Sequence, residues 1–413
     1  MHRKITTFSA EFLWFFLLLR MQQQDPPLYT TPFILLCTSF ALFGASFNMI
    51  LPELPAFLTN LGGEDYKGFI IALFTLTAGI SRPFSGKLAD TIGRIPVIIF
   101  GAVVCIICSL IYPILSTVSG FLLLRFFHGF STGFTPTAIS AYVADIVSDK
   151  RRGEAMGIIG VSINLGSSIG PTLGSYLAVY FSLTTMFYTS SFVALLSMLL
   201  LLRLQETLET KQTFHPRLLA LKKGEVIDKQ SIIPAVICGL VYLGFGVIIT
   251  ITPDQSVYLG MINKGAFFTS FTLCSILSRL VAGRLSDIYG RVVAIRWSAF
   301  LLAIAFFVMG QSNSPTWLLV SSGLVGFSLG IGIPALFAWT IDRSQPKNRG
   351  KAMATLYIGL EVAIGSGALM GAAIYDNNAA NFSIAFAVTA IFPLLALLFL
   401  RNQKDVEQLA MFN

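Results

Sequence analysis

Glu361 is the residue whose type and position most plainly suggest chemistry. It lies eleven residues past Gly350, where a long apolar run begins (361 − 350 = 11). In a membrane-crossing helix, a rise of about 1.5 Å per residue would place it ~16 Å deep, near the middle of a ~30 Å hydrocarbon layer. Hydrocarbon disfavours the charged form, so such a carboxylate can bind and release a proton. Direct binding of a cationic substrate and a structural hydrogen bond are the alternative roles.

Other polar side chains also interrupt apolar runs. Arg125 and His128 share one run, where a charge is costly and usually faces a cavity or a partner. An arginine that extends toward the membrane surface and a packing histidine are the alternatives for this pair. Asn48, Asn164 and Tyr357 complete, with Glu361, the set that we expect to face a substrate cavity; Tyr357 and Glu361 are one helical turn apart and share a face.

Several kinds of chemistry have no residues to support them. Cys105 and Cys108 form a C-x-x-C with no second Cys or His pair nearby, so we interpret them as inert buried thiols. The three histidines are scattered, which argues against a metal site. No G-x-x-x-x-G-K-[ST] loop exists, so ATP is not expected to drive the protein. We predict no cofactor, and we predict that the chain is not an enzyme.

The composition is that of a membrane protein. Of the 413 residues, 55% are hydrophobic and only 12% are charged, against about 25% charged in a soluble domain. Because a lipid bilayer admits only helices and closed barrels, and these apolar runs do not alternate, we predict twelve transmembrane helices in an all-α membrane protein. The runs cover residues 33–59, 67–84, 96–116, 119–144, 153–181, 184–203, 232–258, 265–284, 292–311, 315–341, 350–374 and 382–400.

The basic residues follow the orientation rule of membrane proteins. The net charge is +8, and most Lys and Arg fall in alternate loops, while the intervening loops hold only Lys67 and Lys264. This asymmetry places both termini and the central linker in the cytoplasm. We therefore treat the charge as a topology signal and expect no nucleic-acid partner.

The two halves of the chain are repeats at a fixed offset of 197 residues. Ser81 matches Ser278 and Arg94 matches Arg291 (278 − 81 = 197; 291 − 94 = 197). Chance matching of apolar residues would not align charges and glycines without a gap, so we predict two pseudo-symmetric six-helix bundles with a substrate site between them. The predicted divisions are a cytoplasmic leader (1–31), an N-terminal bundle (32–203), a cytoplasmic linker (204–231), a C-terminal bundle (232–401) and a cytoplasmic tail (402–413).

A charged, glycine-rich loop occurs once in each half. Residues 86–94 read GKLADTIGR, and residues 283–291 repeat the pattern. The loop resembles the signature loop of the major facilitator superfamily, and the resemblance covers residues 30–400. It implies the major facilitator fold and a network of charges that locks the outward-facing state. The Arg-x-x-x-Gly-x-x-x-Gly pattern from Arg125 to Gly133 resembles another motif of the family, which implies that Arg125 and His128 are, with Glu361, the candidates for proton coupling. The expected conformational-switch residues are Gly86, Asp90, Gly93, Arg94, Asp145, Arg152, Gly283, Asp287, Gly290, Arg291, Asp342 and Arg349.

A second motif points to a branch of that family. Gly166, Gly170, Pro171 and Gly174 form G-x-x-x-G-P-x-x-G, which resembles the motif of the twelve-span drug:proton antiporters. Ser175 stands where the family often has another glycine. The middle of the first span offers Ser46 and Asn48 in place of the acid that many drug exporters carry, which weakens a multidrug assignment.

These observations together favour a secondary active transporter that works by alternating access. The resemblance implies proton-coupled efflux of a small organic solute, from a bacterial inner membrane and as a monomer within the lipid bilayer. A proton-coupled importer of a metabolite and a non-transporting receptor on a transporter scaffold are the alternatives. Residues 1–20 are either an interfacial leader or the result of a start chosen upstream of Met21.

Overall fold

The computed structural model describes residues 28–147, 151–220, 227–344 and 349–403. Within these ranges, the side chains of residues 152–154, 280–285, 287–288 and 349–350 lie outside the description. Most of the predicted leader, part of the linker and nearly all of the predicted tail are therefore not covered.

The described residues form twelve helices of 18 residues or more and no strand, which confirms the all-α prediction. The first long helix, α2 (Thr31–Met49), ends just before Pro52 and Pro55, and the short helices η1 (Leu51–Glu53) and α3 (Leu54–Asn60) follow it. The long helices are α2 (Thr31–Met49), α4 (Lys67–Thr91), α5 (Arg94–Ile111), α6 (Val118–Ile146), α7 (Arg152–Tyr180), α8 (Leu183–Leu201), α9 (Ile232–Tyr258), α10 (Ala266–Tyr289), α11 (Arg291–Gly310), α12 (Pro315–Arg343), α13 (Arg349–Tyr375) and α14 (Phe382–Leu400).

The signature loop is shorter than its sequence suggests. Gly86 and Asp90 belong to the last turns of α4, and the turn is made at Gly93, whose φ is 122°. Gly290, its repeat counterpart, has a φ of 96°. Both values lie in the region that L-residues rarely adopt, so glycine is needed at these two positions. A Cβ at Gly86 would meet only Thr137, at 3.9 Å, so Gly86 makes no close helix contact.

Ten of the described helices are long and apolar enough to cross a membrane. Helices α6 and α10 are not among these ten, and part of α10 (280–285 and 287–288) lies outside the described side chains. In α6 the polar groups Arg125, His128 and Ser131 are fully buried. They face neighbouring helices rather than lipid, so the helix can span the bilayer despite these polar groups.

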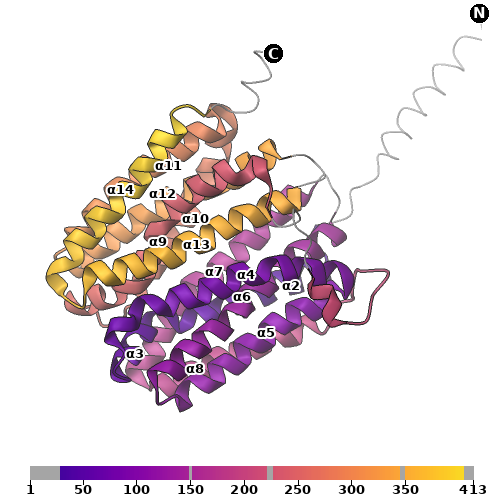
Figure 1. Ribbon diagram of the computed structural model, residues 1–413, viewed down its shortest axis with the longest axis horizontal. Helices are drawn as coiled ribbons and strands as arrows, with labels where there is room; N and C mark the ends of the chain where they lie inside the picture. Colours follow the sequence, from indigo (N-terminus) through magenta and orange to yellow (C-terminus); the bar gives the residue numbers. More distant parts are fainter. Residues whose placement is uncertain (1–27, 148–150, 221–226, 345–348, 404–413) are drawn as a thin grey trace, which may run out of the picture.

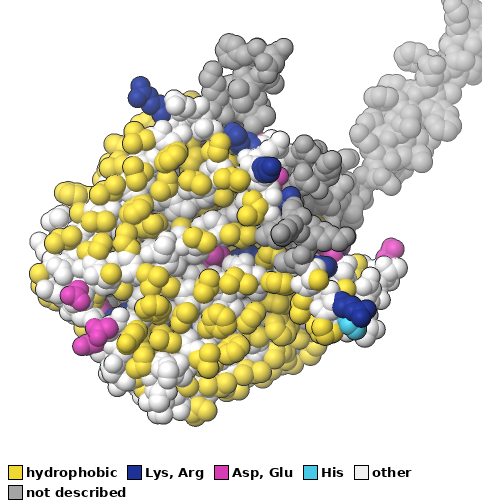
Figure 2. Space-filling view, viewed as in Figure 1, with side chains coloured by type: hydrophobic (Ala, Val, Ile, Leu, Met, Phe, Trp, Pro, Cys, Tyr) yellow, Lys and Arg dark blue, Asp and Glu magenta, His cyan; other side chains and the backbone are white. Residues whose placement is uncertain are grey.

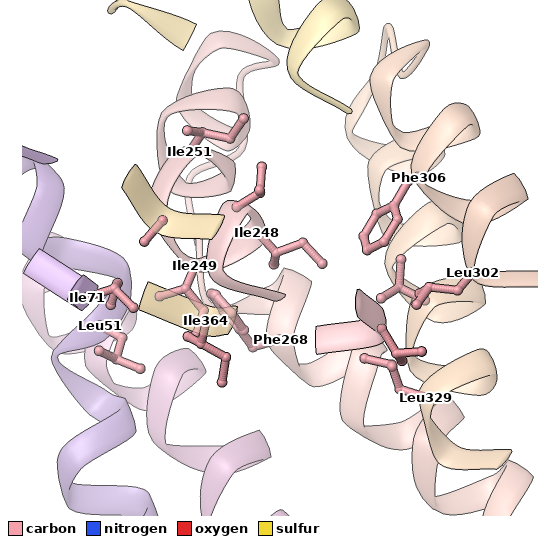
Figure 3. Close-up of a cluster of buried hydrophobic side chains, with 14 of the residues drawn as sticks. Leu51, Ile71, Ile248, Ile249, Ile251, Phe268, Leu302, Phe306, Leu329 and Ile364 are labelled. Atoms are coloured by element: carbon pink, nitrogen blue, oxygen red, sulfur yellow. The ribbon is translucent and has the colours of Figure 1, made fainter. Parts of the chain in front are cut away.

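The helices form two six-helix bundles that lie side by side (Figure 1). Helices α2 to α8 make the first bundle and α9 to α14 the second. One hydrophobic cluster joins them: Leu51 and Ile71 from the first bundle pack with Ile249 and Ile364 from the second (Figure 3). A separate cluster, which includes Phe40, contains residues of the first bundle and its flanking segments, among them Leu28 and Leu218. The first hydrophobic cluster is therefore the one that is continuous across the bundle interface.

The surface fits a bilayer. Hydrophobic side chains cover the face shown in Figure 2, and Lys and Arg gather toward the end that carries the linker. We call this the linker end and the opposite end the far end. Large apolar side chains such as Phe192, Trp297 and Leu398 are more than half exposed, which lipid but not water would tolerate.

Glycines set the closest helix contacts. Cβ atoms at Gly166, Gly170 and Gly174 of α7 would overlap the backbone of α2 at Ala41, Ala45 and Met49. The antiporter-type motif is thus the packing face of α7 against α2 within one bundle. Small residues permit such approach where hydrophobic driving force between membrane helices is absent.

This packing predicts a stability difference between two substitutions in α7. Gly166→Ala should destabilise the protein by about 1–3 kcal/mol, because the new methyl group meets the rigid backbone of α2. Gly157→Ala is the control, since a Cβ there has no neighbour within 4 Å. Thermal unfolding of purified protein in detergent measures both; equal midpoints for the two variants would contradict the assigned contact.

Candidate functional site

An ion pair joins the two bundles deep in the apolar part of the molecule. Arg82 of α4 and Glu361 of α13 are 2.6 Å apart (Nη2 to Oε1), and both side chains are only 9% exposed. The sequence placed Glu361 in the membrane interior but identified no partner for it. Arg82 falls in the predicted run of residues 67–84, and in the structure α4 continues past it to Thr91.

The neighbours of this pair hold the arginine in place. The Tyr357 ring centroid lies 4.4 Å from the Arg82 guanidinium carbon, which is a cation–π contact. On the other side, a Cβ at Gly79 would lie 3.4 Å from the Glu361 Cβ, so α4 passes close to the carboxylate. Two of the predicted cavity residues, Tyr357 and Glu361, therefore contact the same guanidinium.

Arg125 and His128 lie in a different place. Arg125 is fully buried in the first bundle, where its Nε donates to the Ile70 carbonyl at 2.8 Å and its guanidinium stacks on Phe74 at 4.5 Å. His128 Nδ1 is 3.3 Å from the Tyr112 hydroxyl, which is also 3.4 Å from Arg125 Nη1. These contacts bring Arg125 and His128 together but not to Glu361, and they do not direct Arg125 toward the membrane surface.

The two asparagines differ in their contacts. Asn48 donates to the Gly44 carbonyl at 2.8 Å and to the Ser167 hydroxyl at 3.0 Å, so its amide ties α2 to α7. The Asn164 amide nitrogen is buried and has no hydrogen-bond partner in the part of the chain that the structure describes. Only Asn164 thus keeps a donor free for another molecule.

Arg94 gathers two of the predicted switch acids at the linker end. Asp90 lies 2.9 Å from its Nη1, and Asp145 lies 3.1 Å from its Nε. Asp145 also accepts a 2.5 Å hydrogen bond from Thr207, in the connection that follows α8. The signature loop of the first half is therefore held to the first bundle and to the start of the linker.

Glu206 is a member of this cluster that sequence reasoning missed. Its carboxylate accepts hydrogen bonds from the backbone amides of Arg94 (2.9 Å) and Ile95 (3.0 Å), which are the first residues of α5. A carboxylate at this positive helix end is favourable, and Glu206 supplies it. An acid placed just after the sixth span was the available signal.

The second half repeats this arrangement in part. Asp342 lies 3.6 Å from Arg291 Nε, and Arg291 Nη1 donates to the Ser286 hydroxyl at 3.0 Å. The side chains of three predicted switch residues, Arg152, Asp287 and Arg349, lie outside the described residues, as do the surroundings of Gly283.

Two further ion pairs join the bundles at the far end. Lys67 of α4 is 2.5 Å from Asp254 of α9, and Lys264 is 2.6 Å from Glu53. The two lysines are repeat counterparts (264 − 67 = 197). Each pair contains one residue from each half, so both pairs cross the seam between the bundles, although their acids, Asp254 and Glu53, are not repeat counterparts (254 − 53 = 201).

Ser175 completes the seam at the far end. Its hydroxyl donates to Glu53 at 2.8 Å and accepts from the Gly265 amide at 3.1 Å. The Thr172 hydroxyl, on the preceding turn of α7, accepts or donates a hydrogen bond with Thr269 of α10. The departure from the family motif at Ser175 thus supplies a hydrogen bond between the bundles.

Two repeated bundles of apolar helices, joined through charges at their interface, define a polytopic membrane transporter. The family model described as the Major Facilitator Superfamily matches residues 36–261 and, again, residues 235–410. The chain belongs to this family. The family and the relatives named below are transporters rather than enzymes.

Relatives and solved structures agree with this assignment. The Multidrug resistance protein 2 of Bacillus subtilis (strain 168) is 33% identical over 169 residues, which are 40% of this chain and 42% of that protein. The Multi-drug resistance efflux pump PmrA homolog of Lactococcus lactis subsp. lactis (strain IL1403) is 26% identical and aligns over 80% of this chain and 85% of its own length. The crystal structure of a D-xylose-proton symporter superposes with a TM-score of 0.75 at 17% identity, covering 90% of this chain and 97% of its own, and so shares the fold.

The Arg82–Glu361 pair predicts a characteristic pattern of stabilities. Arg82→Gln and Glu361→Gln should each destabilise the protein by about 3–5 kcal/mol, because each leaves one buried charge without its partner. The double variant should be more stable than the sum of the two losses predicts, since neither charge remains. Unfolding in detergent at constant pH measures the cycle, and strict additivity would contradict a direct pair.

The far-end ion pairs predict a change in accessibility. In a variant lacking the five native cysteines, a cysteine at Thr172 should react slowly with a membrane-impermeant maleimide applied from the far side. Replacing both Lys67 and Lys264 by Gln should raise the labelling rate at least several-fold, because both ion pairs across the seam are lost. Lys211→Gln, in the exposed linker, is the control; unchanged labelling in the double lysine variant would show that the pairs do not hold the seam closed.

Proposed function

We propose that this protein exports a small organic solute in exchange for protons by alternating access, with Glu361 as the proton-binding group. The observation that carries the proposal is the ion pair between Arg82 and Glu361, because it crosses the bundle interface at a depth where charges are costly. Any event that neutralises Glu361 changes how strongly the bundles attract each other at this point.

Protonation of Glu361 has a defined consequence. The neutral carboxyl group no longer attracts the guanidinium, so Arg82 loses its ionic partner and keeps the Tyr357 ring. Breaking a buried pair costs about 3–5 kcal/mol. A proton crossing a potential of 100 mV releases about 2.3 kcal/mol, which is of similar size. The driving force available to one proton at this potential is therefore a sizeable fraction of the cost of breaking the pair.

The seam between the bundles at the far end is a second place where the protein can open and close. The ion pairs Lys67–Asp254 and Lys264–Glu53 hold the bundles together there, so access from the far side requires both to break. The charge cluster at Arg94 instead holds its loop to the first bundle and the linker. We infer that the bundles move as units, with the far-end seam opening in one phase of the cycle.

Direction and location rest on the relatives and on charge. The bacterial relatives named above carry multidrug resistance or efflux in their names. The concentration of Lys and Arg toward the linker end supports a cytoplasmic linker and cytoplasmic termini, and hence a far end that faces outward. We therefore propose that the protein is a monomer in a bacterial inner membrane and that it exports its solute from the cell.

The fold leaves open whether the solute moves with or against the proton, because the D-xylose-proton symporter shares it. The direction of proton movement decides this point. In an exporter that exchanges solute for protons, the protons move in the direction opposite to the solute. In a proton-coupled importer, the protons and the solute move in the same direction.

The test is proton movement in proteoliposomes. A first screen compares the sensitivity of expressing and deletion strains to toxic compounds, and the best hit serves as the substrate. Adding it should drive counter-movement of protons in the wild type, and Glu361→Gln should reduce this at least tenfold. Glu209→Gln, at an exposed linker position, should behave as the wild type. Proton-driven transport that survives in Glu361→Gln would remove Glu361 from the mechanism.

A further inference from the structure

Arg279 of α10 is the repeat counterpart of Arg82 (279 − 82 = 197), but its surroundings differ. Among the side chains that the structure describes, Arg279 has no ion pair and no hydrogen bond, and its Nε is buried without a partner. The phenol of Tyr242 is close enough to interact with it electrostatically. A guanidinium thus lies at the bundle interface without the carboxylate that Arg82 has.

The repeat shows what is missing. Glu361, which pairs with Arg82, corresponds to Asn164 (361 − 164 = 197), and Tyr357, which stacks on Arg82, corresponds to Gly160 (357 − 160 = 197). Arg279 does reach the matching place, because its Nη1 lies 4.0 Å from the Cβ position of Gly160 on α7. The scaffold of the contact is therefore repeated, while its acid is replaced by an amide and its aromatic ring by a hydrogen atom.

The space in front of Arg279 is open. A Cβ at Gly160 would have only the Arg279 guanidinium within 4 Å, and a Cβ at Gly157 would have no neighbour at all. Gly157, Gly160 and Asn164 follow one another at spacings of three and four residues, so they share one face of α7. The buried amide nitrogen of Asn164 has no acceptor among the described residues. An unpartnered N–H donor of Asn164 therefore lies on the face of α7 that the Arg279 guanidinium reaches at Gly160.

Such a set of groups selects the charge of its ligand. A guanidinium stays protonated, offers its donors in a planar fork and binds carboxylate or phosphonate oxygens in pairs. An uncompensated cation at this depth is unfavourable, so a bound anion would gain from the same attraction that Glu361 gains from Arg82.

We propose that Arg279 and Asn164 form the subsite for an oxyanion group, such as a carboxylate or phosphonate, on the transported molecule. This rests on the proposed function, since it takes the interface of the bundles as the transport path. The ligand's anion occupies the position that the Glu361 carboxylate holds in the other half. The glycines at 157 and 160 leave room for the body of a small organic molecule.

Equilibrium binding to the purified full-length protein in lipid nanodiscs tests the subsite. The probes are benzoate and phenylphosphonate, with the isosteric neutral benzamide as the matched control, at constant ionic strength. Both anions should raise the thermal unfolding midpoint in a saturable way, and benzamide should not. Arg279→Gln should weaken the apparent affinity at least tenfold, and Arg279→Lys should weaken it less. Arg203→Gln, at an exposed position, should match the wild type.

A second variant tests the subsite from the opposite direction. Asn164→Glu supplies the missing carboxylate, so it should raise the unfolding midpoint without any probe and abolish stabilisation by the anions. The subsite would be overturned if benzamide stabilised the protein as much as benzoate, or if the anions had no effect. It would also be overturned if anion binding survived in Arg279→Gln, or if Asn164→Glu lowered the midpoint. The binding experiment uses no proton gradient, so it is independent of transport. If proton-coupled flux were absent while the anions still bound, that result would contradict the proposed function and not the subsite.

Discussion

Charges that are buried in hydrocarbon need partners, and this constraint organises the interior of the protein. Arg82 obtains Glu361 and the Tyr357 ring, while Arg125 obtains a carbonyl, a phenol and an aromatic face. The partners of Arg125 belong to its own bundle, whereas the partners of Arg82 belong to the opposite one. An interaction that satisfies a buried charge therefore also determines how the two halves meet, and a change in that charge must be felt at their interface.

The internal repeat separates the scaffold from the parts that vary. Gly93 and Gly290 make the same turn, and Gly129 and Gly326 approach the carbonyls of Phe74 and Phe271, which are themselves 197 residues apart (271 − 74 = 197). At the level of Arg82 and Arg279 the backbone arrangement is again shared, but the facing side chains are not. A symmetric framework with an asymmetric interface gives two similar positions different chemistry: Arg82 has an ionic partner, and Arg279 has none among the described side chains.

Much of this architecture could be predicted because bilayers limit the choices. Apolar runs give the helices, and a constant offset of charged and glycine residues gives the two bundles. The partner of Glu361 could not be found in this way, since it lies 279 residues away in the sequence. Glu206 was missed for a related reason: its role depends on the connection after α8 folding back onto the first turn of α5. Tertiary contacts of this kind leave no periodic signal.

The central claim is that binding of a proton to Glu361 breaks its ionic contact with Arg82, and this claim can be tested without any substrate. Infrared difference spectra of the purified protein, recorded between acidic and alkaline pH, report the protonation of individual carboxyl groups. The account predicts a carboxyl band that grows on acidification, is absent in Glu361→Gln and is altered in Arg82→Gln, because the carboxylate then lacks its ionic partner. A spectrum in which Glu361→Gln and Arg82→Gln both match the wild type would contradict it.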